Sequence, residues 1–373
     1  MPAMTTPIRV LMASTSYPAD AADWRGLFIR QITFALARRQ DVALKVWCPP
    51  GEFPAGVEYV ANASDRAWLD QLSRSGGIAH AMRSGRPTAI LRPLQLLRRL
   101  NGLYRRETAA DVIHANWLQV ALPLPADRRP LLVTVLGTDF RLLRIPGMKF
   151  LLQRVFSARR TVICPNADWM VQELRRHFGE VAEVQCVPFG IQEDYFSLTR
   201  RTQSPHQWLC VSRVTPAKIG DLFRWGESCF SGSGRQLHLF GPMQTPVPLP
   251  DWVVYHGPVS QAELLDRWFP RASGLISLSN HSEGRPQVMI EAMAAGLPII
   301  ASDLAAHREL VEANGAGIIC RSAAELEPAL ETLETSTGPE AGKRAREVAA
   351  RLYGTWDDGA ARFASIYRRL AAR

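Results

Sequence analysis

The sequence predicts an α/β protein made of two doubly wound domains, each with a parallel sheet. Short runs of Val, Ile and Leu alternate with amphipathic stretches, which is the pattern of parallel strands joined by helices. The pattern lapses once, in the polar stretch 198–206, as is typical of a domain boundary. A length of 373 residues accommodates two domains. We therefore expect domains at 1–197 and 198–354, with a terminal helix at about 355–373 that can pack back on the first.

The elements of the first domain follow from hydrophobic periodicity. Residues 8–13 and 42–47 are expected to form buried strands, and the apolar positions of 27–39 share one helical face. Each further strand candidate is followed by polar residues, Gly or Pro; these strands are expected at 111–114, 131–136, 161–164 and 184–187.

The second domain repeats the alternation of strands and helices. Its strands are expected at 207–213, 236–240, 252–256, 274–279, 298–302 and 317–320. In two open sheets of this kind, facing each other across a cleft, ligands bind at the carboxyl ends of the strands. The chemistry should therefore lie on loops that follow strands.

Composition excludes several classes of protein. Hydrophobic residues make up 47% of the chain and charged residues 21%, which excludes a disordered or fibrous chain. No run of eighteen apolar residues occurs and the start of the chain is unlike a signal peptide, so we expect a cytoplasmic location. The six cysteines are far apart and lack a C-x-x-C pair, which argues against a disulfide scaffold and against a metal site.

The net charge of +9 permits an anionic partner but does not identify one. Arginine supplies nearly all of the positive charge. Nucleic acid and an anionic membrane surface are both compatible with that charge. No nucleic-acid-binding motif accompanies the arginines, so we expect no nucleic acid partner and treat such a protein as a remote third alternative.

The segment 277–303 is the most informative part of the chain. A strand is expected to end in a polar loop that carries Glu283, and a helix that carries Glu291 begins near Pro286 and closes at Gly296. The free amides at a helix start form a seat for a phosphate or an anionic leaving group. The alternative is an ordinary strand, loop and helix with both glutamates solvated.

This segment resembles the signature of the retaining glycosyltransferases of family 4. In that family the pattern Glu-Gly-x-Pro-x-x-x-x-Glu-Ala-x-Ala-x-Gly-x-Pro is specific, and every fixed position is present from Glu283 to Pro298. The resemblance implies the GT-B fold, with two Rossmann-like domains. It also implies that the following residues bind the sugar-nucleotide donor: Gly284, Arg285, Pro286, Gln287, Val288 and Glu291.

A second match to the family lies at the first strand of the second domain. Arg213 and Lys218 stand five positions apart after that strand, and the resemblance implies that they hold the donor diphosphate. A diphosphate leaving group needs fixed cations, which agrees with this role. Most pairs of this kind are surface charges, and that is the alternative. Farther along, Gly241 and Gly257 end two strands that are similar to the family's nucleotide loops.

Three segments of the first domain also resemble the family. Gly26 matches a strand-to-helix turn near the donor phosphates, where many relatives have two glycines. His114 and Asn116 match a strand end that often reads His-x-His in relatives. Asn cannot exchange a proton near neutral pH, so acid–base chemistry is doubtful at Asn116. For His114, a catalytic role and a buried core histidine are equally supported.

The third of these segments is a turn usually written His-Gly-Thr-Asp in the family. Here Leu136 replaces the His, and Gly137, Thr138 and Asp139 remain. We expect the polar groups of these three residues to border the sugar site.

The resemblance implies transfer of a sugar from a nucleotide-sugar, such as UDP- or GDP-hexose, to an acceptor hydroxyl with retention and without metal or cofactor. Glu283 would hold donor sugar hydroxyls and Glu291 the ribose hydroxyls. Synthesis of a bacterial cell-surface polysaccharide or lipid-linked glycan is the expected setting. A nucleotide-sugar epimerase or hydrolase with the same donor site is the alternative activity.

The acceptor is suggested by two segments that are both basic and apolar, 83–106 and 141–160. Such segments would contact a glycan or lipid-linked acceptor at an anionic membrane, which could be the inner face of the plasma membrane. The equally supported alternative is that their apolar positions face the domain core.

Overall fold

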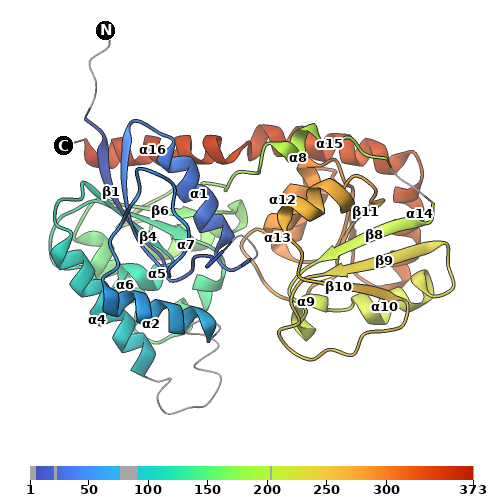
Figure 1. Ribbon diagram of the computed structural model, residues 1–373, viewed down its shortest axis with the longest axis horizontal. Helices are drawn as coiled ribbons and strands as arrows, with labels where there is room; N and C mark the ends of the chain where they lie inside the picture. Colours follow the sequence, from blue (N-terminus) through green and yellow to red (C-terminus); the bar gives the residue numbers. More distant parts are fainter. Residues whose placement is uncertain (1–5, 21–22, 76–90, 202–203, 373) are drawn as a thin grey trace, which may run out of the picture. The chain divides into compact units, whose positions relative to one another are not determined.

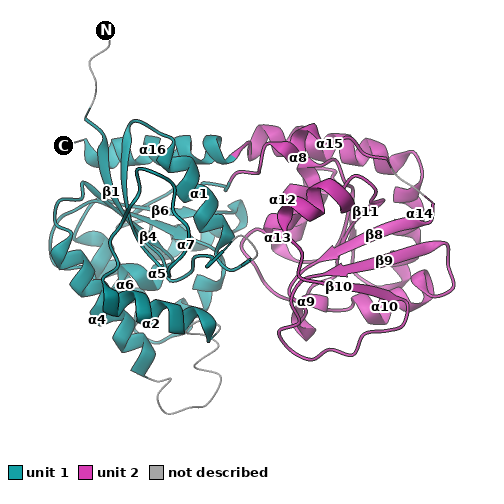
Figure 2. Ribbon diagram, in the orientation of Figure 1, with its two compact units in different colours: residues 1–189, 356–373 teal, residues 190–355 magenta. Residues whose placement is uncertain are grey.

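The protein forms two α/β units, each with a parallel sheet covered by helices on both faces. The computed structural model describes residues 6–20, 23–75, 91–201 and 204–372. Unit 1 comprises residues 1–189 and 356–373, and unit 2 comprises residues 190–355 (Figure 2). Two parallel Rossmann-like sheets agree with the fold that the sequence predicts.

The sheet of unit 1 has seven strands within the described residues, and all of its pairings are parallel. Its spatial order is β3 (Glu58–Tyr59), β2 (Val42–Trp47), β1 (Ile8–Ala13), β4 (Val112–Asn116), β5 (Leu131–Val135), β6 (Thr161–Pro165) and β7 (Glu183–Val184). The order reverses between β1 and β4, so the carboxyl ends of these two strands form the switch point, where ligands bind in doubly wound sheets.

Both faces of this sheet are buried, as parallel strands require. Leu11 and Ala13 pack into a core with α4 and α6, whereas Val10 and Met12 pack with α1 and α16. The helices and 3₁₀ turns of unit 1 are α1 (Leu27–Ala37), α2 (Ala63–Arg74), α4 (Leu91–Arg106), α5 (Leu118–Ala121), η2 (Thr138–Arg144), α6 (Met148–Ser157), η3 (Asp168–Met170), α7 (Val171–Phe178) and α16 (Trp356–Ala371). Figure 1 shows α16, the last helix of the chain, running along unit 1.

The sheet of unit 2 has six strands in the described residues and the same topology. Its order is β10 (Val253–Gly257), β9 (Arg235–Phe240), β8 (His206–Val211), β11 (Gly274–Ser277), β12 (Ile299–Ser302) and β13 (Gly317–Cys320). Here the order reverses between β8 and β11. The loops after β8 and β11 therefore meet at the switch point of this sheet.

The helices of unit 2 cover two cores, one on each face of the sheet. They are α8 (Asp194–Ser197), α9 (Pro216–Ile219), α10 (Leu222–Phe230), α11 (Gln261–Glu263), η4 (Leu264–Trp268), α12 (Gln287–Ala294), α13 (Ala305–His307), η5 (Arg308–Glu312), η6 (Ala323–Glu325), α14 (Leu326–Glu334) and α15 (Thr337–Leu352). The six strands that the sequence predicts for this unit each begin and end within two residues of the strands β8 to β13.

The division between the units falls earlier than the polar stretch 198–206 suggests. Leu198 is buried in a core of unit 2. The Arg200 guanidinium donates to the carbonyl oxygens of Gly296 and Ala272, both at 2.7 Å. Part of the expected linker is therefore built into unit 2, because an arginine can satisfy main-chain carbonyls while its chain is buried. Residues 202–203 lie outside the described residues.

Candidate functional site

The switch point of unit 2 brings together Lys218 and Glu283. Lys218 lies in α9, after β8, and Glu283 lies in the loop after β11, four residues before α12. The Lys218 Nζ donates to the Glu283 carboxylate as an ion pair, and the side chains are only 11% and 24% exposed. Burial lowers the pKa of Lys218, and the charge of Glu283 opposes that shift. Two charged groups 65 residues apart in sequence thus share one site.

Arg213 adds a second cation beside this pair. It follows β8 and its Nη1 lies 3.4 Å from the Gln244 Oε1. Its charge also acts to lower the pKa of Lys218. The two cations predicted from the sequence are therefore near each other, which suits an anion that accepts hydrogen bonds from both.

A chain of hydrogen bonds fixes the loop that carries Glu283. The Ser302 Oγ, at the end of β12, donates to the Ser279 carbonyl at 2.5 Å. The Ser279 Oγ donates to the Ala217 carbonyl in α9 at 3.3 Å, and the Asn280 amide donates to the same carbonyl at 2.8 Å. The ends of β11 and β12 and the Lys218 helix are thereby tied together.

His307 belongs to the same region and was not identified from the sequence. It is 1% exposed, and its Nδ1 lies 3.0 Å from the Ser302 carbonyl. Burial lowers its pKa, while the charge of Glu283 raises it and that of Lys218 lowers it. The position of Ser302 at a strand end could have indicated this region, but nothing in the sequence links His307 to it.

The start of α12 has main-chain amides without a side-chain cap, while its first side chains contact other parts of unit 2. The helix begins after Pro286 without a side-chain cap. The Gln287 Nε2 donates to the Gly190 carbonyl at 3.0 Å, and Val288 packs partly against a core. The main-chain amides of α12 thus remain the groups suited to an anion.

The surroundings of Glu291 differ from those of the Lys218–Glu283 pair. It is 5% exposed, and its Oε1 accepts a hydrogen bond from the Gln261 Nε2 at 2.8 Å. Burial raises its pKa to about 8, against hydrogen bonds from Gln287 and Gln261. Gln261 lies thirty residues earlier in the chain, so no local pattern pairs it with Glu291.

Arg285 turns into unit 2, where it forms internal contacts. It is 9% exposed, forms an ion pair with Glu309, and its guanidinium lies 4.7 Å from the centre of the Tyr353 ring. These contacts suit a residue that anchors the loop, in contrast to the donor contact that the resemblance implies. Gly284 is buried beside it.

Gly241 and Gly257 both have a positive φ, but of the two only Gly241 also lacks space for a side chain. Gly241 has φ 129°, and a Cβ there would lie 1.9 Å from the Ser212 carbonyl oxygen. Gly257 has φ 73° with open space around it. The Gly241 amide donates to the Gly257 carbonyl at 2.8 Å. The loops after β8, β9 and β10 thus approach each other closely, which places the two glycines and Arg213 at one edge of the sheet.

In unit 1, Asn116 and Gly26 lie near the switch point between β1 and β4 and are buried, whereas the predicted turn at Gly137–Asp139 follows β5. The Asn116 Nδ2 donates to the Ala13 carbonyl at 3.3 Å, which joins the ends of those strands. Gly26 precedes α1 with φ 68°, and a Cβ there would lie 2.6 Å from the Ser16 Oγ. A side chain would therefore disturb this turn.

His114 is a buried core histidine in the structure. It is 1% exposed, and its Nδ1 and Nε2 each lie 2.7 Å from a hydroxyl, those of Tyr367 and Thr134. Burial lowers its pKa to about 3. Of the two interpretations of His114, the geometry therefore favours packing, because both ring nitrogens are already bonded within unit 1.

Asp139 fixes two loops of unit 1. It is 2% exposed, and its carboxylate accepts from the amides of Leu118 and Leu136 at 2.9 and 2.7 Å. Burial raises its pKa to about 6, against these hydrogen bonds. Gly137, with φ 95°, precedes η2, and Thr138 is exposed beside it. Of this predicted turn, Thr138 is the side chain that solvent reaches.

Within the described residues, no group of three or more His, Cys, Asp or Glu side chains is arranged to hold a metal ion. No helix there combines the length and apolar character needed to cross a bilayer.

Comparison with known proteins gives a match to a family model over part of unit 2. Residues 230–335, from the last residue of α10 to the end of α14, match the family model described as glycosyl transferases group 1. A search of curated protein sequences returned no match.

Among solved structures, a sucrose-phosphate synthase from Thermosynechococcus elongatus is similar, with a TM-score of 0.71 and 16% identity over 98% of this chain and 99% of that one. A trehalose-6-phosphate synthase gives 0.67 and 12% over 97% and 99%. Anabaena HepE in complex with UDP-glucose gives 0.62 and 16% over 96% and 100%. The chain therefore has the GT-B fold, and a segment of its second unit matches glycosyl transferases group 1.

Proposed function

We propose that the protein is a retaining glycosyltransferase of family 4 that moves a hexose from a nucleoside diphosphate sugar to an acceptor hydroxyl. The observation that carries this proposal is the partly buried Lys218–Glu283 pair, with Arg213 beside it, at the switch point of unit 2. The similarity of residues 230–335 to glycosyl transferases group 1 supports it. The structural similarity to HepE, which was solved with UDP-glucose, agrees with a sugar nucleotide as donor.

In the proposed reaction the protein stabilises the departing nucleoside diphosphate. Arg213, Lys218 and the first amides of α12 supply positive charge where the leaving group becomes more negative. Glu283 orients Lys218 and offers its other oxygen to hydroxyls of the donor sugar. These groups can take the place of a divalent cation, so we propose a metal-independent transfer without a cofactor.

We propose that unit 1 binds the acceptor, a glycan or a lipid-linked glycan. Retention of configuration is part of the proposal, and the similar trehalose-6-phosphate synthase was studied for glycosyl transfer with retention. The setting we propose is bacterial cell-surface glycan synthesis in the cytoplasm, at the inner face of the plasma membrane.

A basic and apolar surface on η2 and α6 supports contact with an anionic membrane. Residues 140–160 include no Asp or Glu. Exposed apolar side chains alternate there with exposed cations: Ile145 is 49% exposed, Phe150 65% and Leu151 50%, beside Arg144 and Lys149. Apolar groups that enter the headgroup region and cations that meet anionic lipid are the two components of interfacial binding. Residues 83–90 of the other basic segment lie outside the described residues.

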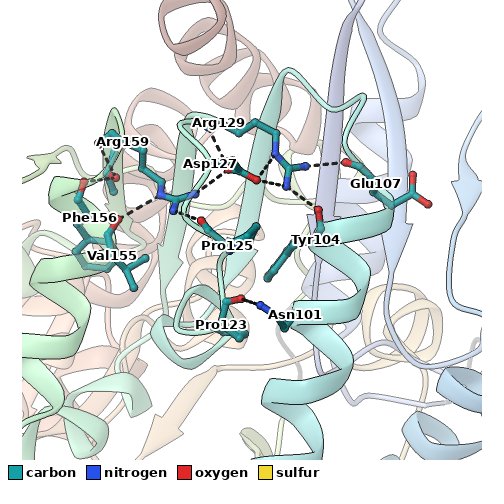
Figure 3. A network of polar contacts seen from close by, with 11 residues as sticks. Asn101, Tyr104, Glu107, Pro123, Pro125, Asp127, Arg129, Val155, Phe156 and Arg159 are labelled. Carbon is teal, nitrogen blue, oxygen red and sulfur yellow. Dashed lines mark hydrogen bonds and ion pairs between the residues drawn. The ribbon is translucent and has the colours of Figure 1, made fainter.

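A polar network holds the helices that carry these basic segments (Figure 3). The Arg129 guanidinium donates to the carbonyls of Tyr104 and Glu107 at the end of α4, and it pairs with Asp127. Asp127 also pairs with Arg159, which donates to the Val155 carbonyl of α6 at 3.2 Å. Both helices are thereby fixed to the segment before β5.

The test of the donor site is a thermal-shift screen of the purified protein against UDP, GDP and ADP. A nucleotide that binds only the native state raises the melting temperature, and the Lys218→Ala variant should lose that increase. The matched control is Lys343→Ala, an exposed lysine of α15. Failure of all three nucleotides to bind would contradict the proposal. With the donor identified, free sugar or an epimer formed without acceptor would indicate the hydrolase or epimerase instead.

Membrane contact is tested by sedimentation with liposomes that contain anionic lipid, at low and high salt. Binding should weaken with salt and with charge reversal at Lys149. Absence of salt-sensitive binding would end this part of the proposal without affecting the donor site.

A further inference from the structure

Glu291 is a buried carboxyl group without a cation. It is 5% exposed in the second half of α12, and within the part of the chain that the structure describes no Lys or Arg forms an ion pair with it. Its hydrogen-bond partners are the side-chain amides of Gln261, at 2.8 Å, and Gln287. Neutral amides stabilise a buried carboxylate far less than a guanidinium or an ammonium group does.

The other glutamate of the motif has the opposite environment. Glu283 is 24% exposed and is paired with Lys218. One motif therefore contains a charged, paired carboxylate and a carboxyl group whose ionisation is opposed by its surroundings. Environments that separate two titratable groups in this way assign them different tasks.

A buried tyrosine lies beside Glu291. Tyr195 in α8 faces it, and within the described residues the Tyr195 hydroxyl is buried with no hydrogen-bond partner. Burial and the charges of Glu291 and Asp194 raise the pKa of Tyr195 far above its ordinary value. Burial raises the pKa of Glu291 itself to about 8.

We propose that Glu291 carries a proton in the free protein at neutral pH, and that binding of the nucleoside diphosphate expels this proton to solvent. This inference rests on the proposed function and on the contact between Glu291 and the ribose hydroxyls that the resemblance to family 4 implies. Two hydroxyl groups that donate to the carboxylate add charge-assisted hydrogen bonds, which favour its ionised form. The proton leaves for the buffer, so nucleotide affinity rises with pH until Glu291 is ionised in the free protein as well.

Titration calorimetry of nucleotide binding tests the proposal. UDP, GDP and ADP are titrated into the full-length protein near pH 7.5 in two buffers that differ in ionisation enthalpy. The wild-type protein should release about one proton for each nucleotide bound. The Glu291→Gln variant should release none. The Glu347→Gln variant, at an exposed glutamate of α15, should release as much as the wild type.

A second variant keeps the carboxyl group and so does not depend on how Glu291→Gln folds. Gln261→Leu removes one amide donor to Glu291, which disfavours the ionised form, and the release should then extend to higher pH. Nucleotide binding without proton release in the wild type, or with equal release in Glu291→Gln, would overturn this inference and leave the proposed function intact. Absence of binding by any of the three nucleotides would instead overturn the proposed function.

Discussion

The two units share one sheet topology but use their switch points differently. In unit 2 the strands at the reversal are followed by charged residues, Arg213, Lys218 and Glu283, which interact with each other at partly open positions. In unit 1 the corresponding polar residues, Asn116 and Asp139, are buried and hydrogen-bonded to main-chain groups. The same topology thus places cations suited to an anion at the switch point of unit 2. In unit 1 it places buried polar side chains that hold the loops in position.

This difference fits the roles that we propose for the two units, with the donor bound by unit 2 and the acceptor by unit 1. A diphosphate needs fixed positive charge, which is costly to bury unless it is paired. An acceptor hydroxyl needs shape and neutral hydrogen bonds, which rigid loops can provide.

The largest effect is expected from loss of a cation in unit 2. Lys218→Ala should reduce turnover by about 100-fold to 1000-fold, because charge stabilisation of the leaving group is lost. Arg213→Ala should act in the same direction. The measurement is the initial rate of sugar transfer once the donor is known, with Lys343→Ala as the control. Near-normal activity in both variants would remove these cations from the mechanism and with them the contrast between the units.

In unit 1 the expected effect of mutation is on stability. His114→Ala should lower the free energy of unfolding by about 3 kcal/mol, since it opens a cavity and leaves two buried hydroxyl groups without a partner. Tyr367→Phe should cost about 1 kcal/mol. Urea unfolding followed by fluorescence measures both. A His114→Ala protein of unchanged stability that has lost turnover would restore a catalytic role for this residue.

The environment of Glu291 should make stability depend on pH. Its pKa is about 8 in the folded protein and near 4.5 in an unfolded chain, so between these values the folded state binds more protons. The contribution of Glu291 to the free energy of unfolding is therefore greatest at low pH, and it is lost as the pH rises toward 8. From pH 6 to pH 8 the wild type should lose about 2 kcal/mol more than Glu291→Gln does. Equal pH dependence would show that Glu291 is ionised throughout.

The smallest effect is expected at Ser302, which acts on the site through Ser279. Ser302→Ala removes the hydrogen bond to the Ser279 carbonyl and should cost about 1 kcal/mol of stability. Because the loop also positions Glu283, kcat should fall by more than KM changes. Ser336→Ala, at an exposed serine, is the control. A variant with lower stability but normal kcat would show that this chain of hydrogen bonds stabilises the fold and does not position Glu283 for turnover.

Much of the fold could be predicted because its strands are continuous apolar runs that have to be buried on both faces. The strand expected at 8–13 has those bounds in the structure. The terminal helix α16 packs in the same core of unit 1 as the β1 residues Val10 and Met12. The division between the units could not be predicted from the polar stretch 198–206. Whether Arg200 is solvated or buried depends on carbonyl oxygens of Gly296 and Ala272, which are far away in the sequence.

By itself, the sequence determined where the strands lie along the chain, which loops follow them and which residue types those loops carry, because each depends on local periodicity and spacing. Only the tertiary structure decided the state of each side chain. The pairing of Lys218 with Glu283, the isolation of Glu291 beside Gln261 and the burial of His114 all depend on residues distant in the chain. Charge state and availability follow from burial and partners, and both arise only when distant segments pack together.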